Sequence, residues 1–210
     1  MTHSATTHSA TTGISAMTRT LPGLLALMLA LSGCLSLGGK LPPTLFAMNA
    51  ANPVLAGAVT SGDPRTAIMV MEPDTDQRLA TVRIPVQIDD TNVAYVQNAA
   101  WVERPARLFR ALLAETMRGK TNVLVLEDSQ AVANVGVRLA GRLIDLGYDA
   151  RTSSVVVRYE AIRSGPTGMV TTKRFESIVP GIAAKPEFIG PALNRAANDV
   201  AGQVAAWVTG

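Results

Sequence analysis

The sequence predicts an α+β fold in which a mostly antiparallel sheet is packed on one side by two main helices, all within a single domain. Apolar and polar residues alternate over residues 135–178, and the turn-forming stretch 164–168 interrupts them, as is typical of an antiparallel meander. Two other stretches, 104–118 and 187–208, space their apolar residues as helices do. Because helices and strands with one apolar face bury each other in layers, these features together favour helices lying on a sheet.

The N-terminal segment, residues 1–33, is predicted to be a signal peptide that the mature protein lacks. Residues 21–31 form an apolar run of 11 residues. This run is shorter than the roughly 20 residues needed to cross a bilayer, but it fits the core of a secretory signal, and an arginine precedes it. Residues 1–16 contain a polar repeat, and a start at Met17 would leave a signal of ordinary length. Whether translation starts at Met1 or Met17 stays open.

The chain has one cysteine, Cys34, directly behind the apolar run. Leu31-Ser32-Gly33-Cys34 resembles the bacterial lipobox, in which a diacylglyceryl group is joined to the cysteine sulfur and the signal is cut before it. The alternatives are an ordinary signal peptide with a cysteine nearby and a buried structural thiol, although the stretch after Cys34 reads as a flexible tether. Leu35 stands where an aspartate would resemble an inner-membrane retention signal. We therefore expect the outer membrane, with the domain in the periplasm.

The composition of the mature chain limits its function. Residues 34–64 are expected to form the lipidated tether, and residues 65–210 the domain. The mature chain would keep 18 of the 19 basic residues and all 16 acidic ones, which gives no electrostatic footprint for nucleic acid. Both histidines fall in the signal, which removes Ser-His-Asp and Cys-His nucleophile pairs and the commonest zinc ligand. No catalytic group, metal or cofactor is expected.

The first half of the domain is predicted to alternate short strands with turns before a helix. An early strand is expected near 44–47, and the later elements are strands at 65–71, 80–88, 93–96 and 123–126 with turns at 72–76 and 89–92. Pro85 is expected at an edge or bulge, because proline cannot donate to a strand ladder. Trp101-Val102-Glu103-Arg104-Pro105 is expected to open the helix, and Gly119 to end it.

The meander is predicted to have one apolar and one charged face. Val155, Val157 and Tyr159 share a side of their strand. Four charged residues are expected on the solvated side as cross-strand pairs: Arg158, Glu160, Arg174 and Glu176. The final helix, residues 187–208, is expected to lay its apolar stripe on the sheet.

Few residues are candidates for chemistry. Asp89-Asp90 is the best carboxylate pair, but neighbours on a strand point to opposite faces, so a turn is the favoured interpretation. Residues 74–76 lack the glycine and distal glutamate of a calcium loop, and residues 127–129 read as a strand exit. Trp101 and Trp207 are either ligand-surface residues or anchors of helix packing.

Several segments together resemble a known family. They are the lipobox, the Pro-rich Leu41-Pro42-Pro43-Thr44-Leu45-Phe46, the segment from Val93 to Pro105 that contains Tyr95 and Trp101, the meander, and the helix from Ala192-Leu193-Asn194 through Trp207. In these features the chain resembles the ABC-type transport auxiliary lipoproteins, which include the paraquat-inducible protein C-like partners of MCE-domain lipid transporters. The resemblance implies an outer-membrane lipoprotein that docks or assembles a periplasmic MCE-domain protein working with an inner-membrane ABC permease and ATPase. Tyr95 and Trp101 are its candidate partner-binding residues.

Three functions stay open from the sequence. The first is the non-catalytic docking subunit that the resemblance implies. The second is a stand-alone lipid- or glycan-binding lipoprotein with a pocket between helices and sheet. The third is a hydrolase that uses carboxylates.

Overall fold

A computed structural model of the chain describes residues 43–128 and 134–210. Cys34 and the preceding lipobox residues Leu31, Ser32 and Gly33 lie outside the described residues. The described helices and strands are β1 (Thr44–Phe46), the 3₁₀ turn η2 (Pro64–Thr66), β2 (Ile68–Val70), β3 (Asp74–Thr75), β4 (Pro85–Gln87), β5 (Val93–Tyr95), β6 (Ala99–Trp101), α2 (Pro105–Lys120), β7 (Val125–Glu127), β8 (Val137–Asp149), β9 (Ser154–Ser164), β10 (Val170–Val179) and α3 (Pro186–Thr209).

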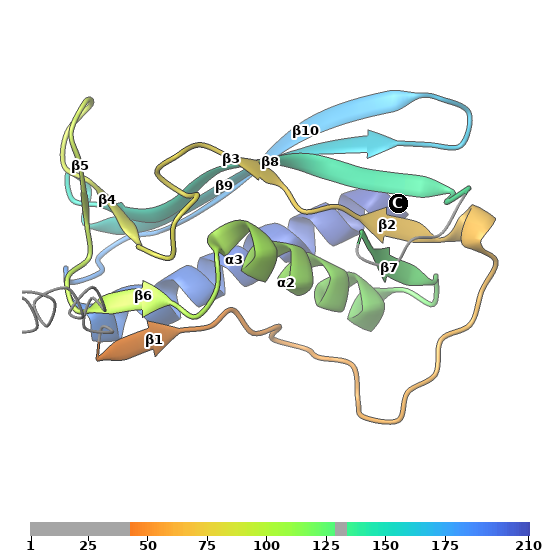
Figure 1. Cartoon of the computed structure of the whole chain (residues 1–210), viewed down its shortest axis with the longest axis horizontal. Helices are drawn as coiled ribbons and strands as arrows, with labels where there is room; N and C mark the ends of the chain where they lie inside the picture. The colour runs from red at the N-terminus through yellow and green to blue at the C-terminus, as the bar shows by residue number, and fades with distance from the viewer. Residues whose placement is uncertain (1–42, 129–133) are drawn as a thin grey trace, which may run out of the picture. The chain divides into compact units, whose positions relative to one another are not determined.

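The predicted α+β class is confirmed. Strands β8, β9 and β10 form a long antiparallel meander, and both helices lie on one side of it (Figure 1). Three short strands, β2, β3 and β4, pair in turn with the free edge of β8, all parallel to it. β7 extends the sheet beyond β2, and β5 pairs antiparallel with β4. Parallel pairing in this sheet therefore involves only short strands of two or three residues along one long strand and beside it.

The core lies between the helices and the sheet. Phe109 and Leu113 of α2 and Val200 of α3 are fully buried in one apolar cluster with Tyr159 of β9. The rings of Phe109 and Tyr159 meet edge to face, with their centroids 5.2 Å apart. Among the described residues, no helix has the length and hydrophobicity needed to cross a membrane.

Several predicted boundaries were wrong. The 72–76 turn contains β3, because Asp74 and Thr75 pair with Arg142 and Leu143 of β8. Of the predicted strand 80–88 only β4 forms, and Pro85 is its first residue, where a missing N–H costs least.

The helix boundaries also differ from the prediction. Trp101 does not open α2 but lies in β6, which pairs parallel with β1. α2 begins at Pro105 and continues one residue past Gly119, with Thr121 as its C-cap. The final helix forms almost as predicted.

Candidate functional site

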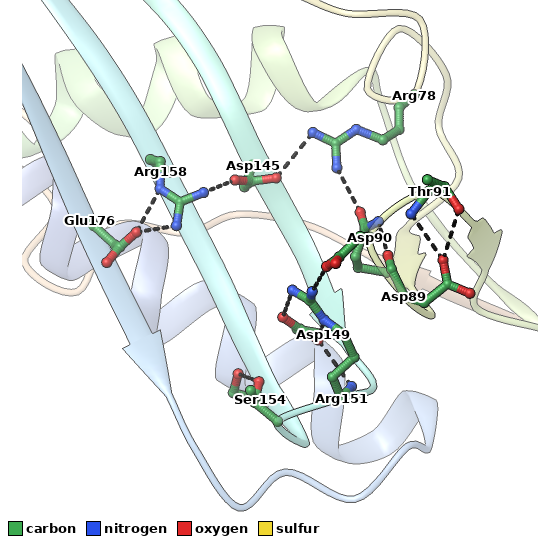
Figure 2. Close-up of polar contacts among 12 residues, drawn as sticks. Arg78, Asp89, Asp90, Thr91, Asp145, Asp149, Arg151, Ser154, Arg158 and Glu176 are labelled. Atoms are coloured by element: carbon green, nitrogen blue, oxygen red, sulfur yellow. Dashed lines mark hydrogen bonds and ion pairs between the residues drawn. The ribbon is translucent and has the colours of Figure 1, made fainter.

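The side of β8, β9 and β10 that faces away from the helices carries rows of charged side chains. We call Asp145, Arg158, Glu160, Arg174 and Glu176 the open sheet face. Arg158 lies between two carboxylates: its guanidinium donates to Asp145 on β8 and, at 2.6 Å from Nε to Oε2, to Glu176 on β10 (Figure 2). Arg174 donates to Glu160 at 2.7 Å. The cross-strand pairs predicted for these strands are therefore confirmed.

A β-bulge in β8 places Asp145 on the open sheet face. Strict alternation from Leu139 and Leu143, both buried, would turn the side chain of residue 145 toward the core. The register instead shifts between Leu143 and Asp145, and the buried positions resume at Leu146 and Tyr148. Sequence reasoning missed Asp145, although the break in the apolar alternation was a signal that could have found it.

Arg78, from the segment after β3, closes the bulge. Its Nη2 atom donates to the carbonyl oxygen of Ile144 at 2.7 Å and to Oδ1 of Asp145 at 3.0 Å, and its Nε donates to Asp76 at 3.1 Å. Burial alone would lower the pKa of Arg78, but the charges and hydrogen bonds of Asp145 and Asp76 outweigh that effect and raise it. The guanidinium therefore stays charged and connects the loop to the irregular part of the strand.

A shallow cleft of about 290 Å³ lies beside this network, between β4, residues 88–92 and the ends of β8 and β9. Arg151 forms one of its walls and is held by Asp149, at 2.8 Å from Nη2 to Oδ2, and by an ion pair with Asp90 (Figure 2). The hydrogen bond from Arg151 lowers the pKa of Asp149, although burial acts in the opposite direction. The cleft is thus lined by both signs of charge, each already paired.

The turn interpretation of Asp89-Asp90 is confirmed. Asp89 accepts hydrogen bonds from the side chain of Asn92 at 2.7 Å and from the backbone N–H groups of Thr91 and Asn92, each at 2.9 Å. These bonds, the Asn92 side chain first, hold the pKa of Asp89 far below its usual range. Asp90 pairs instead with Arg151, so the two carboxylates have different partners and do not form one site.

The two candidate partner-binding residues lie in different environments. Tyr95 on β5 is partly exposed, and the guanidinium of Arg83 lies over its ring, 4.0 Å from the centroid. Trp101 is only 1% exposed and meets Phe46 edge to face, with a centroid distance of 6.1 Å. Trp101 is therefore a core residue of this fold, and of the two only Tyr95 can contact a partner directly.

A second ionic cluster joins α2 to the strands beside it. Arg110 is largely buried among Glu72, Glu127 and Asp128, with Nε 3.2 Å from Glu127. Asp128 also accepts the backbone N–H of Glu72 at 2.9 Å. Helical spacing alone does not predict this burial of Arg110, because it does not show which strands lie opposite a side chain.

The chemical capacity of these groups follows from their pairing. On the open sheet face and in the cleft, each arginine described above forms an ion pair with at least one carboxylate. Within residues 43–128 and 134–210, no group of three or more His, Cys, Asp or Glu side chains is placed to hold a metal ion. The arrangement suits the exchange of ion pairs with another charged surface.

Fold and site together define a single α+β domain with an open, charged sheet face. No protein-family model matches the sequence, and no curated protein matches it either. Solved structures do share the fold. One, an uncharacterized protein, matches with a TM-score of 0.64 at 12% identity, over 79% of this chain and 97% of its own.

A second similar structure is that of protein XCC0632 from Xanthomonas campestris, of the family model DUF330. It matches with a TM-score of 0.59 at 14% identity, over 79% of this chain and 91% of its own. PelC from Paraburkholderia phytofirmans, a dodecamer, matches with a TM-score of only 0.39 at 13% identity, over 70% of this chain and 92% of its own. At these identities the likeness shows the fold alone.

Proposed function

We propose that this chain is a non-catalytic lipoprotein subunit of an intermembrane lipid transport system. It is anchored in the outer membrane through Cys34 and docks the periplasmic MCE-domain component, which works with an ABC permease and ATPase. The observation that carries the docking role is the open sheet face, where a long three-stranded surface is left without a helix over it in the described part of the chain.

The energetics of the open sheet face suit docking. Ion pairs between partly exposed side chains contribute only about 0–1 kcal/mol each, so exchanging them for pairs with a partner costs the fold little. Charged groups arranged in rows also fix the register of a partner and speed its approach. Ile178, at the end of β10, is half exposed and adds an apolar contact next to the charges.

The test is a mild-detergent purification of the tagged full-length protein from its native cells, read by mass spectrometry. We expect an MCE-domain protein, a permease and an ATPase to be recovered with it. Arg174→Glu reverses a charge of the open sheet face at a side chain that is 59% exposed. Arg107→Glu is the matched control on α2, because Arg107 is 55% exposed and also has one carboxylate partner.

Recovery of the transport proteins should fall several-fold with Arg174→Glu and stay unchanged with Arg107→Glu. Equal recovery with both variants would show that docking uses another surface. If purification of the unaltered protein repeatedly recovered the lipoprotein alone, the transport role itself would be overturned. Cys34→Ala should release the protein from the outer-membrane fraction, and retention there would overturn the anchor.

A stand-alone binding protein is the second candidate, and the paired charges of the cleft favour it. The pocket expected between helices and sheet is not where such a ligand could lie, because Phe109, Leu113 and Tyr159 fill that space. A polar headgroup or a glycan would instead meet Arg151, Gln87 and Asp90 in the cleft. Lipid or sugar that co-purifies with the protein, and is lost in Arg151→Ala, would support this candidate.

A further inference from the structure

Three exposed aliphatic residues lie in adjacent segments around β1 and β6. Leu45 on β1 is 50% exposed, Val102 directly after β6 is 52% exposed, and Val82 is 41% exposed. We call these three residues the tether-end patch. Single exposed aliphatic residues are common, but neighbouring ones mark contact surfaces.

Backbone hydrogen bonds hold the three segments side by side. β1 and β6 are parallel partners, with Leu45 opposite Ala100 and Phe46 opposite Trp101 (Figure 1). The N–H of Val102 donates to the carbonyl oxygen of Phe46 at 2.9 Å. The N–H of Trp101 donates to the carbonyl oxygen of Val82 at 2.7 Å, which places the Val82 segment on the other side of β6.

The patch is the outer face of a pairing whose inner face is core. Side chains alternate along a strand, so Leu45 and Val102 lie on one side of the β1–β6 pair, with the buried Ala100 between them, and Phe46 and Trp101 lie on the other side. Phe46 packs so closely on α3 that a side chain at Gly190 would come within 2.6 Å of its ring. The inner face is therefore fixed, and the outer aliphatic residues cannot turn inward.

The position of the patch relative to the tether limits what can cover it. The part of the predicted tether that precedes β1 ends at Pro43, next to Thr44. The ten residues from Cys34 to Pro43 span at most about 35 Å, whatever their conformation. A lipid on Cys34 would therefore keep the patch within that distance of the bilayer to which the lipid belongs.

We infer that the tether-end patch inserts into the interface of the membrane that holds the lipid anchor. This inference rests on the proposed function, because it requires the anchor at Cys34. Moving aliphatic side chains from water into the acyl region lowers the free energy of the system. Because the anchor already holds the protein at the membrane, most of the entropic cost of bringing the patch to the bilayer is removed. Two arginines close to the patch in sequence carry charges that lipid phosphates attract: Arg83, whose guanidinium lies over the ring of Tyr95, and Arg104, which is 55% exposed and lies 3.7 Å from Glu72. The contact would orient the domain with the β9–β10 hairpin directed away from the membrane.

The test measures the environment of single labels on the full-length lipidated protein in vesicles of phosphatidylethanolamine and phosphatidylglycerol. Cys34 is the only cysteine and would be acylated, so an introduced cysteine would be the only free thiol. Val102→Cys reports on the patch, and Val82→Cys is a second patch position in case the first destabilises the fold. Met169→Cys is the control, since Met169 is 69% exposed in the hairpin between β9 and β10 (Figure 1).

With an environment-sensitive fluorophore on each thiol, we expect a blue shift and several-fold stronger quenching by nitroxide-labelled lipid at residues 102 and 82 than at 169. Equal quenching at all three positions on vesicle-bound protein would overturn the membrane contact and leave the anchor standing. Protein that does not stay with the vesicles would show that the anchor is absent, and both proposals would fall. Shielding of residue 102 only after a second copy or a partner protein is added would assign the patch to that protein instead.

Discussion

The two faces of β8, β9 and β10 are built from alternating residues of the same strands, yet they hold different interactions. The face toward the helices carries Leu139, Val157 and Tyr159, all fully buried. The open sheet face carries Asp145, Arg158 and other charged residues that remain partly exposed. The first face supplies stability by removing apolar surface from water, whereas the second contributes little to stability and remains available for recognition. Variants on the two faces should therefore separate stability from binding.

The largest loss of stability is expected from the covered face. Phe109→Ala removes a fully buried ring that meets Tyr159, and it should lower the free energy of unfolding by about 3–5 kcal/mol. Urea denaturation followed by circular dichroism measures this loss. Partner recovery per folded molecule should not change. A loss below about 1 kcal/mol would show that the helices are not held to the sheet as described.

A smaller effect is expected from Tyr159→Phe, which tests a buried polar contact on the same face. The hydroxyl donates to the carbonyl oxygen of Ala140 at 2.8 Å, and losing this bond should cost about 1 kcal/mol near neutral pH.

Tyr159 should also give a signature at alkaline pH. Burial raises the pKa of Tyr159 well above its ordinary value of 10.0, so the folded state keeps a proton that the unfolded state loses. Stability linked to this group is complete below pH 10 and declines above it. Between neutral and alkaline pH, the free energy of unfolding measured in urea should therefore fall less for Tyr159→Phe than for the unaltered protein. Identical alkaline profiles would contradict the burial of the hydroxyl.

On the open sheet face, Arg158→Ala should lower the free energy of unfolding by about 1 kcal/mol or less, although it removes the residue between two carboxylates. Arg174→Ala, which breaks one more exposed pair, is the matched comparison and should cost less still. The same urea measurement used for Phe109→Ala gives both values. A cost comparable to that of Phe109→Ala would mean that this face stabilises the fold and is not free to exchange partners.

The smallest effect is expected from Asp149, beside the cleft. Its pKa is lowered in the folded state by Arg151, so its contribution is complete above the ordinary carboxyl pKa of 3.8 and is lost as the pH falls below it. Asp149→Asn should reduce the difference between the free energies of unfolding at pH 6 and pH 3, obtained from urea denaturation, by well under about 1 kcal/mol. Asp74→Asn, in β3, is the control. An unchanged difference for Asp149→Asn would show that the Arg151 contact does not persist in solution.

The sequence predicted the repetitive parts of the fold well. Alternation over the meander found both faces of β9 and the four charged residues that form cross-strand pairs. The structure shows which residues pair, Arg158 with Glu176 and Arg174 with Glu160. Helical spacing found α2 and α3. The short segments were harder, since two or three residues carry no periodicity, and β3 and β6 are strands only because distant segments pair with them.

What the sequence determined by itself is local: the period of each long element, the turn at Asp89, and the apolar run with its cysteine that motivates the membrane anchor. What tertiary structure decided is which residues from distant segments meet. The bulge that turns Asp145 outward, the closure of that bulge by Arg78, the burial of Trp101 against Phe46 and the burial of Arg110 among three carboxylates all join residues far apart in the chain. Local patterns reflect the backbone period within an element, whereas these contacts depend on packing between elements.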